Sequence, residues 1–130
     1  MSKRKQTAVP PFSACISEFV SMMDRAKLDY RWNCDEVNRL DKLTQDYLHK
    51  LELDGLNYKE RARVATSLAR CRQERRESKD MATILEPLVQ FLDSEKGRQI
   101  MSLMKEVLGK TRRVEKGMEC RRYIPRVLEE

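Results

Sequence analysis

Turn-forming residues are scarce in this sequence. It contains four glycines and four prolines among 130 residues. All-β folds join many short strands through turns that need more of these residues, so the sequence favours helices. Aromatic residues are also few, at 6%, which is typical of helices that pack through leucine and methionine.

Cysteine pairs and long apolar runs are absent as well. The four cysteines lie far apart, and none belongs to a CxxC motif: Cys15, Cys34, Cys71 and Cys120. We therefore expect each to be a small apolar residue that is buried or half-buried. No apolar run approaches the roughly 20 residues needed to span a bilayer, and no apolar segment of a signal peptide follows the basic first residues. These absences predict a cytoplasmic protein with reduced thiols.

Motifs of catalysis and metal binding are missing too. The sequence has no GxSxG, GxxxxGK[ST] or HExxH motif and no glycine-rich loop. Its one histidine, His49, has Asp46 and Glu52 three residues away on either side. One helical turn supplies too few ligands for a metal site, and His49 falls on the polar side of its predicted helix. We therefore predict a protein that is not an enzyme and has no catalytic residue, metal site or cofactor.

The composition that remains is rich in charge. Hydrophobic residues make up 40% of the chain and charged residues 37%, with 27 cations and 21 anions for a net charge of +6. The hydrophobic fraction is enough for a modest core. The surplus of positive charge suits binding to nucleic acid or to an acidic protein surface, or simply solubility.

The first half of the chain shows two stretches of helical periodicity. Apolar residues from Phe12 to Ala26 recur with a 3.6-residue period, which predicts a helix over about 11–30. Tyr30 to Asn33 is interpreted as a connector. Asn33 and Glu36 have the spacing of a capping box, with Asp35 as an alternative cap. The second predicted helix ends at Asp54 and Gly55.

The second half opens with another capping-box pair, Asn57 and Glu60. The short connection before it predicts that the second and third helices form an antiparallel hairpin. Beyond about residue 78 the apolar face changes, so residues 58–93 form either one long helix or two, with Pro87 as a kink or a new first turn. Asp93 or Ser94 then caps a further helix that ends at Gly109.

The predicted fold is all-α: a compact bundle of four to five helices with a central antiparallel hairpin. Its expected organisation is a mobile basic tail at 1–9, the helical bundle at 10–109 and a basic C-terminal arm at 110–130. The arm is expected to be extended or a short helix.

A stripe of cations continues an apolar stripe of the third predicted helix. The apolar members are Tyr58, Ala62, Ala65, Leu68 and Ala69, and the cations are Arg72, Arg75, Arg76 and Lys79. The favoured interpretation is internal ion pairing across the hairpin, with Arg72 level with Leu40 and Asp41, and with Arg75 and Arg76 near Glu36 and Val37. The functional alternative is a ridge that faces phosphates or an anionic partner and also includes Arg63 and Arg70.

A second basic cluster lies near the C-terminus. It includes Lys110, Arg112, Arg113, Lys116, Arg121, Arg122 and Arg126, with Tyr123 among them. An aromatic residue between arginines suits an arm that binds nucleic acid. The favoured interpretation is a tail that packs its apolar residues on the bundle while its cations stay in water, because arginine stems routinely cover apolar surface.

Three stretches resemble an uncharacterised group of short helical proteins from phages and prophages of Gram-positive bacteria. They are DKLTQDYLHKLE at 41–52, RRESKD at 75–80 and RRYIPRV at 121–127. The group has no established activity, so the resemblance carries over no functional residue. It implies an accessory phage protein in the host cytoplasm that binds machinery handling DNA or RNA, including defence nucleases.

Three functional hypotheses follow. The first is a non-enzymatic binding protein that modulates or inhibits a nucleic-acid-processing protein or nucleoprotein complex through its basic surfaces. The second is direct binding of DNA or RNA. The third is a homo-oligomeric assembly protein, such as a homodimer, that associates through methionine-rich faces of its first and last helices.

Overall fold

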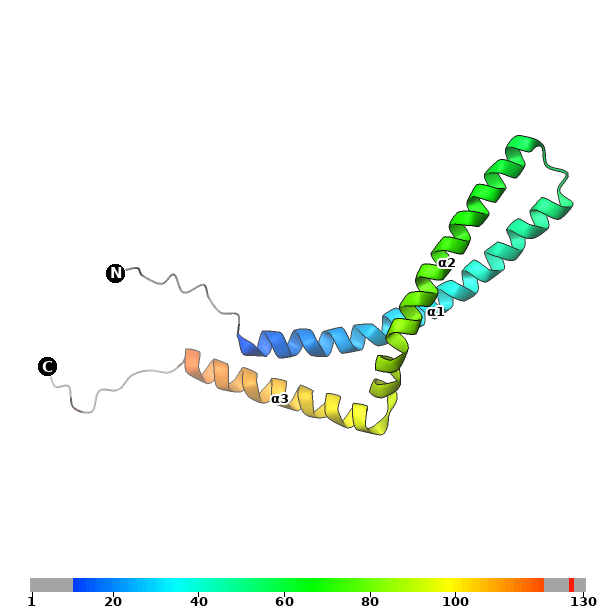
Figure 1. Ribbon diagram of the computed structural model, residues 1–130. Helices are drawn as coiled ribbons and strands as arrows, with labels where there is room; N and C mark the ends of the chain where they lie inside the picture. Colours follow the sequence, from blue (N-terminus) through cyan, green and yellow to red (C-terminus); the bar gives the residue numbers. More distant parts are fainter. Residues whose placement is uncertain (1–10, 121–126, 128–130) are drawn as a thin grey trace, which may run out of the picture.

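The structure is a computed structural model that describes residues 11–120 and residue 127. Within these residues the chain forms three helices and no strand: α1 (Phe12–Leu53), α2 (Tyr58–Asp93) and α3 (Glu95–Glu119). Figure 1 shows α2 returning antiparallel to α1 as a long hairpin, after which α3 turns back along the first half of α1. The all-α class and the antiparallel hairpin are thus as predicted, but residues 11–120 form three helices instead of the four to five expected.

The first helix is continuous through the segment that we interpreted as a connector. No glycine or proline occurs between Phe12 and Leu53, so nothing in the sequence forces an interruption. Asn33 is buried in the middle of α1, and its Nδ2 donates to the carbonyl oxygen of Asp29 at 2.7 Å. The predicted connector is therefore wrong, because Asn33 bonds within its own helix instead of capping a new one.

The turn between α1 and α2 follows the predicted chemistry. Gly55 has a φ of 28°, a left-handed conformation that glycine adopts without the steric penalty of a side chain. Asn57 caps α2: its Oδ1 accepts from the backbone N–H of Glu60 at 2.9 Å, and its Nδ2 donates to Oε1 of Glu60 at 3.2 Å. This reciprocal pair is the expected capping box.

Residues 58–93, for which the sequence allowed either one helix or two, form the single helix α2 with Pro87 inside it. Ser94 then separates α2 from α3 and accepts from the backbone N–H of Gly97 at 3.0 Å, as expected for the cap of a further helix. That helix does not stop at Gly109, because α3 continues to Glu119. Residues 110–119 are therefore part of α3, not a separate arm.

The core lies along a seam between paired helices. On α1, apolar and small residues alternate at intervals of three and four along the whole helix: Phe12, Ile16, Phe19, Met23, Ala26, Tyr30, Asn33, Val37, Leu40, Thr44, Tyr47 and Leu51. On α2, Val64, Cys71, Ser78, Leu85 and Leu92 recur every seven residues. This is the pattern of an antiparallel coiled coil. Among the described residues, Leu40 and Leu92 are the two large side chains that are fully buried.

The predicted apolar stripe of α2 is not its core face. Tyr58 and the three alanines at 62, 65 and 69 are exposed, whereas Val64 and Cys71 are buried. Within residues 11–120, none of the three helices combines the length and the apolar character that a membrane crossing requires.

Candidate partner-binding surfaces

One of the ridge arginines forms the expected ion pair across the hairpin. Nε of Arg75 on α2 pairs with Oδ1 of Asp41 on α1, and the two side chains are 25% and 46% exposed. The predicted partner of Asp41 was Arg72, which lies three residues earlier on α2. The internal interpretation therefore holds for Arg75 alone.

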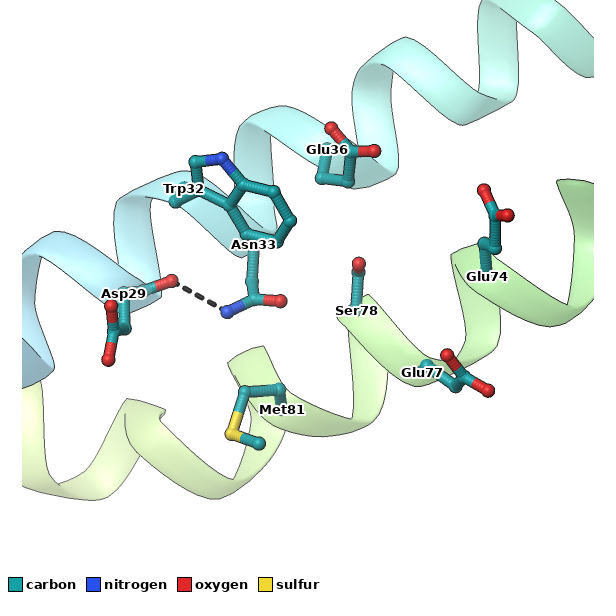
Figure 2. Close-up of a pocket in the computed structure, with 8 residues that line it drawn as sticks. All are labelled: Asp29, Trp32, Asn33, Glu36, Glu74, Glu77, Ser78 and Met81. Carbon is teal, nitrogen blue, oxygen red and sulfur yellow. Dashed lines mark hydrogen bonds between the residues drawn. The ribbon is translucent and has the colours of Figure 1, made fainter.

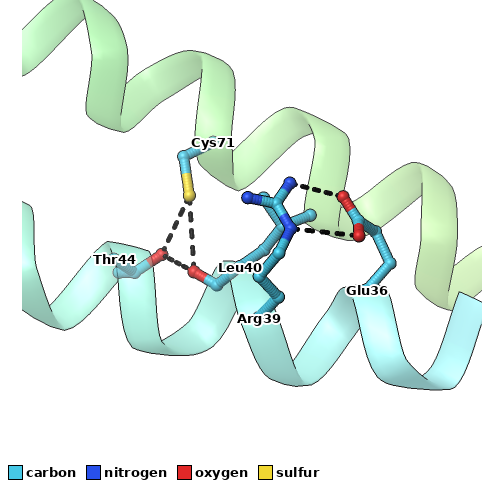
Figure 3. A network of polar contacts seen from close by, with 5 residues as sticks. All are labelled: Glu36, Arg39, Leu40, Thr44 and Cys71. Atoms are coloured by element: carbon cyan, nitrogen blue, oxygen red, sulfur yellow. Dashed lines mark hydrogen bonds and ion pairs between the residues drawn. The ribbon is translucent and has the colours of Figure 1, made fainter.

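Next to this pair, α1 and α2 meet through polar contacts between uncharged groups, as Figure 3 shows. The hydroxyl of Thr44 donates to the carbonyl oxygen of Leu40 at 2.8 Å, and Sγ of Cys71 lies 3.4 Å from each of these two oxygens. Leu40 and Cys71 are both buried, so a well-packed layer fixes the register of α1 against α2 at this level.

Glu36 does not pair with Arg75 or Arg76, contrary to the prediction. Its carboxylate accepts from Nε of Arg39 at 3.1 Å and from Nη2 at 2.5 Å, one turn along the same helix (Figure 3). This two-point hydrogen bond holds the pKa of Glu36 below its ordinary value and raises the pKa of Arg39. Glu36 is thus already neutralised from within α1.

The remaining cations of α2 fall into two separate groups. At about 100° per residue, Arg72, Arg76 and Lys79 lie within a sector of about 60°, whereas Arg63 and Arg70 lie on the opposite side of the helix. All five are exposed, and none forms an ion pair with another residue in the part of the chain that the structure describes. A continuous ridge that includes all the predicted residues is therefore absent from α2. We name Arg72, Arg76 and Lys79 the α2 cation patch.

The C-terminal basic cluster is only partly visible. Arg112 donates from Nη2 to the hydroxyl of Ser17 at 3.3 Å and so joins α3 to α1. Arg113 donates to the carbonyl oxygen of Gly109 at 3.4 Å, and Nζ of Lys110 lies 3.8 Å from Oε1 of Glu106. Lys116 is exposed on α3. The remaining predicted members of this cluster lie outside the described residues: Arg121, Arg122, Tyr123 and Arg126.

An open groove of about 500 Å³ crosses the hairpin on the side away from the α2 cation patch. Four carboxylate residues and two apolar ones line its walls: Asp29, Glu36, Glu74, Glu77, Trp32 and Met81. Figure 2 shows Asn33 and Ser78 between these walls. The sequence prediction missed this groove because it assigned Trp32 and Asn33 to a connector. Their spacing to Glu36 on one helical turn was the available signal.

A second surface that the prediction described only loosely is an apolar face on α1 and α3. Large apolar side chains on both helices are exposed, including Phe12, Met22 and Leu103. We hypothesised methionine-rich faces on the first and last helices, and Met22 and Met118 do belong to this exposed set.

Residues of the kind that catalyse or bind metals are dispersed. Within residues 11–120 and 127, no group of three or more His, Cys, Asp or Glu residues could hold a metal ion together. His49 lies exposed on α1.

Comparison with known proteins provides no relative. No family model, curated protein or solved structure matches the chain. Inference about function therefore depends on the geometry of the chain itself.

Proposed function

We propose that this chain is a small, non-enzymatic accessory protein that binds and modulates or inhibits a nucleic-acid-processing protein or nucleoprotein complex. The observation that carries the proposal is the α2 cation patch. Its three side chains are exposed on one side of a rigid helix, and no carboxylate of the described residues pairs with them. The neighbouring Arg75 is held by Asp41, so internal pairing uses one cation and leaves three for an anionic partner.

The size of the patch favours a protein or nucleoprotein partner over naked nucleic acid. Seven residues of helix separate Arg72 from Lys79, a span of about 10 Å along the axis. Three cations release few counterions from DNA, which corresponds to a slope of about −2 to −3 in log affinity against log salt. Contacts of that number give weak, non-specific binding to nucleic acid alone. An acidic protein surface can add apolar contacts and arginine–carboxylate hydrogen bonds to the same charges.

Arg63 and Arg70 provide a control, because they are exposed cations of the same helix that face the other way. The test captures partners from an extract of host cells on three immobilised proteins: the wild type, a variant with Arg72, Arg76 and Lys79 changed to Ala, and a variant with Arg63 and Arg70 changed to Ala. Circular dichroism checks that the variants keep their helix content.

We expect one protein, with or without associated nucleic acid, to be retained by the wild type and by the Arg63/Arg70 variant and to be lost with the patch variant. Digestion of the extract with nuclease separates a protein partner from a nucleoprotein. If all three proteins retain the same set, the α2 cation patch is not the binding surface and the proposal fails.

Direct nucleic-acid binding is the second candidate, favoured by the additional exposed cations Arg113 and Lys116 on α3. Titration of labelled duplex DNA, single-stranded DNA and RNA across a series of salt concentrations tests it. Tight binding near 150 mM salt with a slope steeper than about −4 would rank this candidate first, because more than the three patch cations must then contact phosphates. Absence of binding near that salt concentration eliminates it.

A further inference from the structure

The seam of α1 extends beyond the helix that covers it. From Ala26 to Leu51 the seam packs against α2, and its members are buried or half-buried. The helix α2 ends at Asp93, whose carboxylate lies 3.3 Å from Nζ of Lys27. The first four seam residues of α1 therefore extend past the end of α2: Phe12, Ile16, Phe19 and Met23.

The helix α3 does not replace α2 on this seam. It contacts α1 through residues beside the seam: Ser13 bonds to Glu115, Ser17 bonds to Arg112, and Val20 is buried. Phe12 consequently stays 73% exposed and Phe19 41% exposed, although they occupy the same helical positions as the fully buried Leu40. Two of the twelve seam residues, Phe12 and Phe19, thus remain exposed within the described chain, whereas Ile16 and Met23 are half-buried.

The helix α3 carries an apolar stripe of its own outside its contact with α1. Its members are Ile100, Leu103, Val107, Val114 and Met118, all at least 44% exposed. Together with Lys110, which occupies the position between Val107 and Val114, they follow the same intervals of three and four. Nζ of Lys110 lies 3.8 Å from Glu106, which draws the ammonium towards the edge of the stripe.

The two stripes face the same side of the α1/α3 layer. Viewed from each N-terminus, the exposed apolar side chains lie about 100° counterclockwise from the face that contacts the other helix. The helices α1 and α3 run antiparallel (Figure 1). With this arrangement, the common offset turns both stripes to one side. The bonds from Ser13 to Glu115 and from Ser17 to Arg112 set the register, which places Phe19 level with the middle of the α3 stripe.

We propose that this face is the interface of a homodimer in which the α1/α3 layers of two copies stack into a four-helix bundle. The eight exposed side chains concerned (Phe12, Phe19, Met22, Ile100, Leu103, Val107, Val114 and Met118) together present on the order of 800 Å², which is about what each partner buries in a stable interface. Apolar patches of this size are uncommon on monomers.

The spacing of the exposed apolar residues on α3 indicates that a second copy of this chain covers the face. A two-fold interface must be complementary to itself, so residue i of one copy meets residue j of the other and the reverse. Ile100, Val107 and Val114 lie seven residues apart and are symmetric about Val107. An antiparallel pair of α3 helices with its two-fold axis at Val107 places Ile100 opposite Val114 of the partner subunit at both ends. The proposal is independent of the α2 cation patch, which lies on another helix.

The first test is the mass of the full chain in solution, measured by light scattering and sedimentation in 0.15 M and 1 M salt. We expect a species of twice 15.4 kDa that persists in high salt, because the interface is apolar. Val107→Glu brings two carboxylates together at the axis and should raise the dimer dissociation constant at least tenfold. Ser102→Glu adds the same charge on the exposed opposite side of α3 and should leave it unchanged.

Cross-linking tests the position of the axis. In a background with the exposed Cys15 and Cys120 changed to Ser, Val107→Cys should oxidise to a disulfide-linked dimer, and Ser102→Cys should not. A monomer at 100 μM, a trimer, or equal cross-linking at the two positions would overturn the proposal. A monomer would leave the face to a different protein or to the terminal residues of the same chain.

Discussion

Glu115 on α3 caps the N-terminus of α1. The N-cap residue of α1 is Pro11, which makes no side-chain hydrogen bond, and the first turn of α1 contains no acidic residue. Glu115 provides both the missing hydrogen-bond acceptor and the missing negative charge from another helix. Its Oε1 accepts from the backbone N–H of Ser13 at 2.9 Å, and its Oε2 accepts from the hydroxyl of Ser13 at 2.5 Å. A carboxylate at this end also interacts favourably with the helix dipole.

This cap makes the packing of α3 on α1 dependent on pH. Donation from the hydroxyl of Ser13, and then from its backbone N–H, holds the pKa of Glu115 below its ordinary value of 4.5. The stability from a carboxyl with a depressed pKa is fully present above the unfolded value and is lost as pH falls through the folded value. The contribution is therefore complete at neutral pH and falls progressively as the pH drops below about 4.5.

We expect Glu115→Gln to lower the midpoint of thermal unfolding at pH 7 by a few degrees, because the amide caps α1 without the charge. The difference from wild type should shrink as the pH is lowered from 5 to 3. Circular dichroism melts across this range measure it, with Glu119→Gln as a control on the exposed last turn of α3. A difference that is the same at pH 7 and pH 3 would contradict the cap.

Local sequence signals predicted the elements that depend on local chemistry. The pair Asn57 and Glu60, the turn at Gly55 and the cap at Ser94 are each determined by a few neighbouring residues, and all three are present. The signal at Asn33 and Glu36 had the same form and was misleading. Inside a long helix, an asparagine can bond to the preceding turn, and tertiary packing decides between the two states.

The surfaces were harder to predict because they depend on which helix face is buried. The alanines of α2 suggested a core face, but a seam through Val64, Cys71 and Ser78 packs against α1. This shift of face moved the register, so Arg75 and not Arg72 meets Asp41. The exposed face of α1 and α3 was not apparent from periodicity, because a seam looks the same whether or not a partner helix covers it.

The Arg75–Asp41 pair should contribute to stability, while Arg72 should not. Both paired side chains are partly exposed, so the coupling free energy expected from a double-mutant cycle of Arg75→Ala and Asp41→Ala is about 0.5–1 kcal/mol. Arg72→Ala should change the free energy of unfolding by less than about 0.5 kcal/mol, since the side chain is exposed. Urea unfolding of the four proteins of the cycle and of Arg72→Ala measures these values. Equal losses from Arg72→Ala and Arg75→Ala would show that the register across the hairpin is different.

The connection between α2 and α3 should depend on the absence of a side chain at residue 97. A Cβ at Gly97 would lie 1.8 Å from the carbonyl oxygen of Phe91 and 2.7 Å from its carbon, both backbone atoms that move only if the turn opens. We expect Gly97→Ala to lower the free energy of unfolding by about 1–3 kcal/mol. Gly117→Ala is the matched control in the same helix, because no atom lies within 4 Å of its Cβ position, and it should stabilise the protein by up to about 1 kcal/mol. Urea unfolding of the two variants tests the pair together, and a neutral or stabilising Gly97→Ala would mean that α3 does not approach the end of α2 in this way.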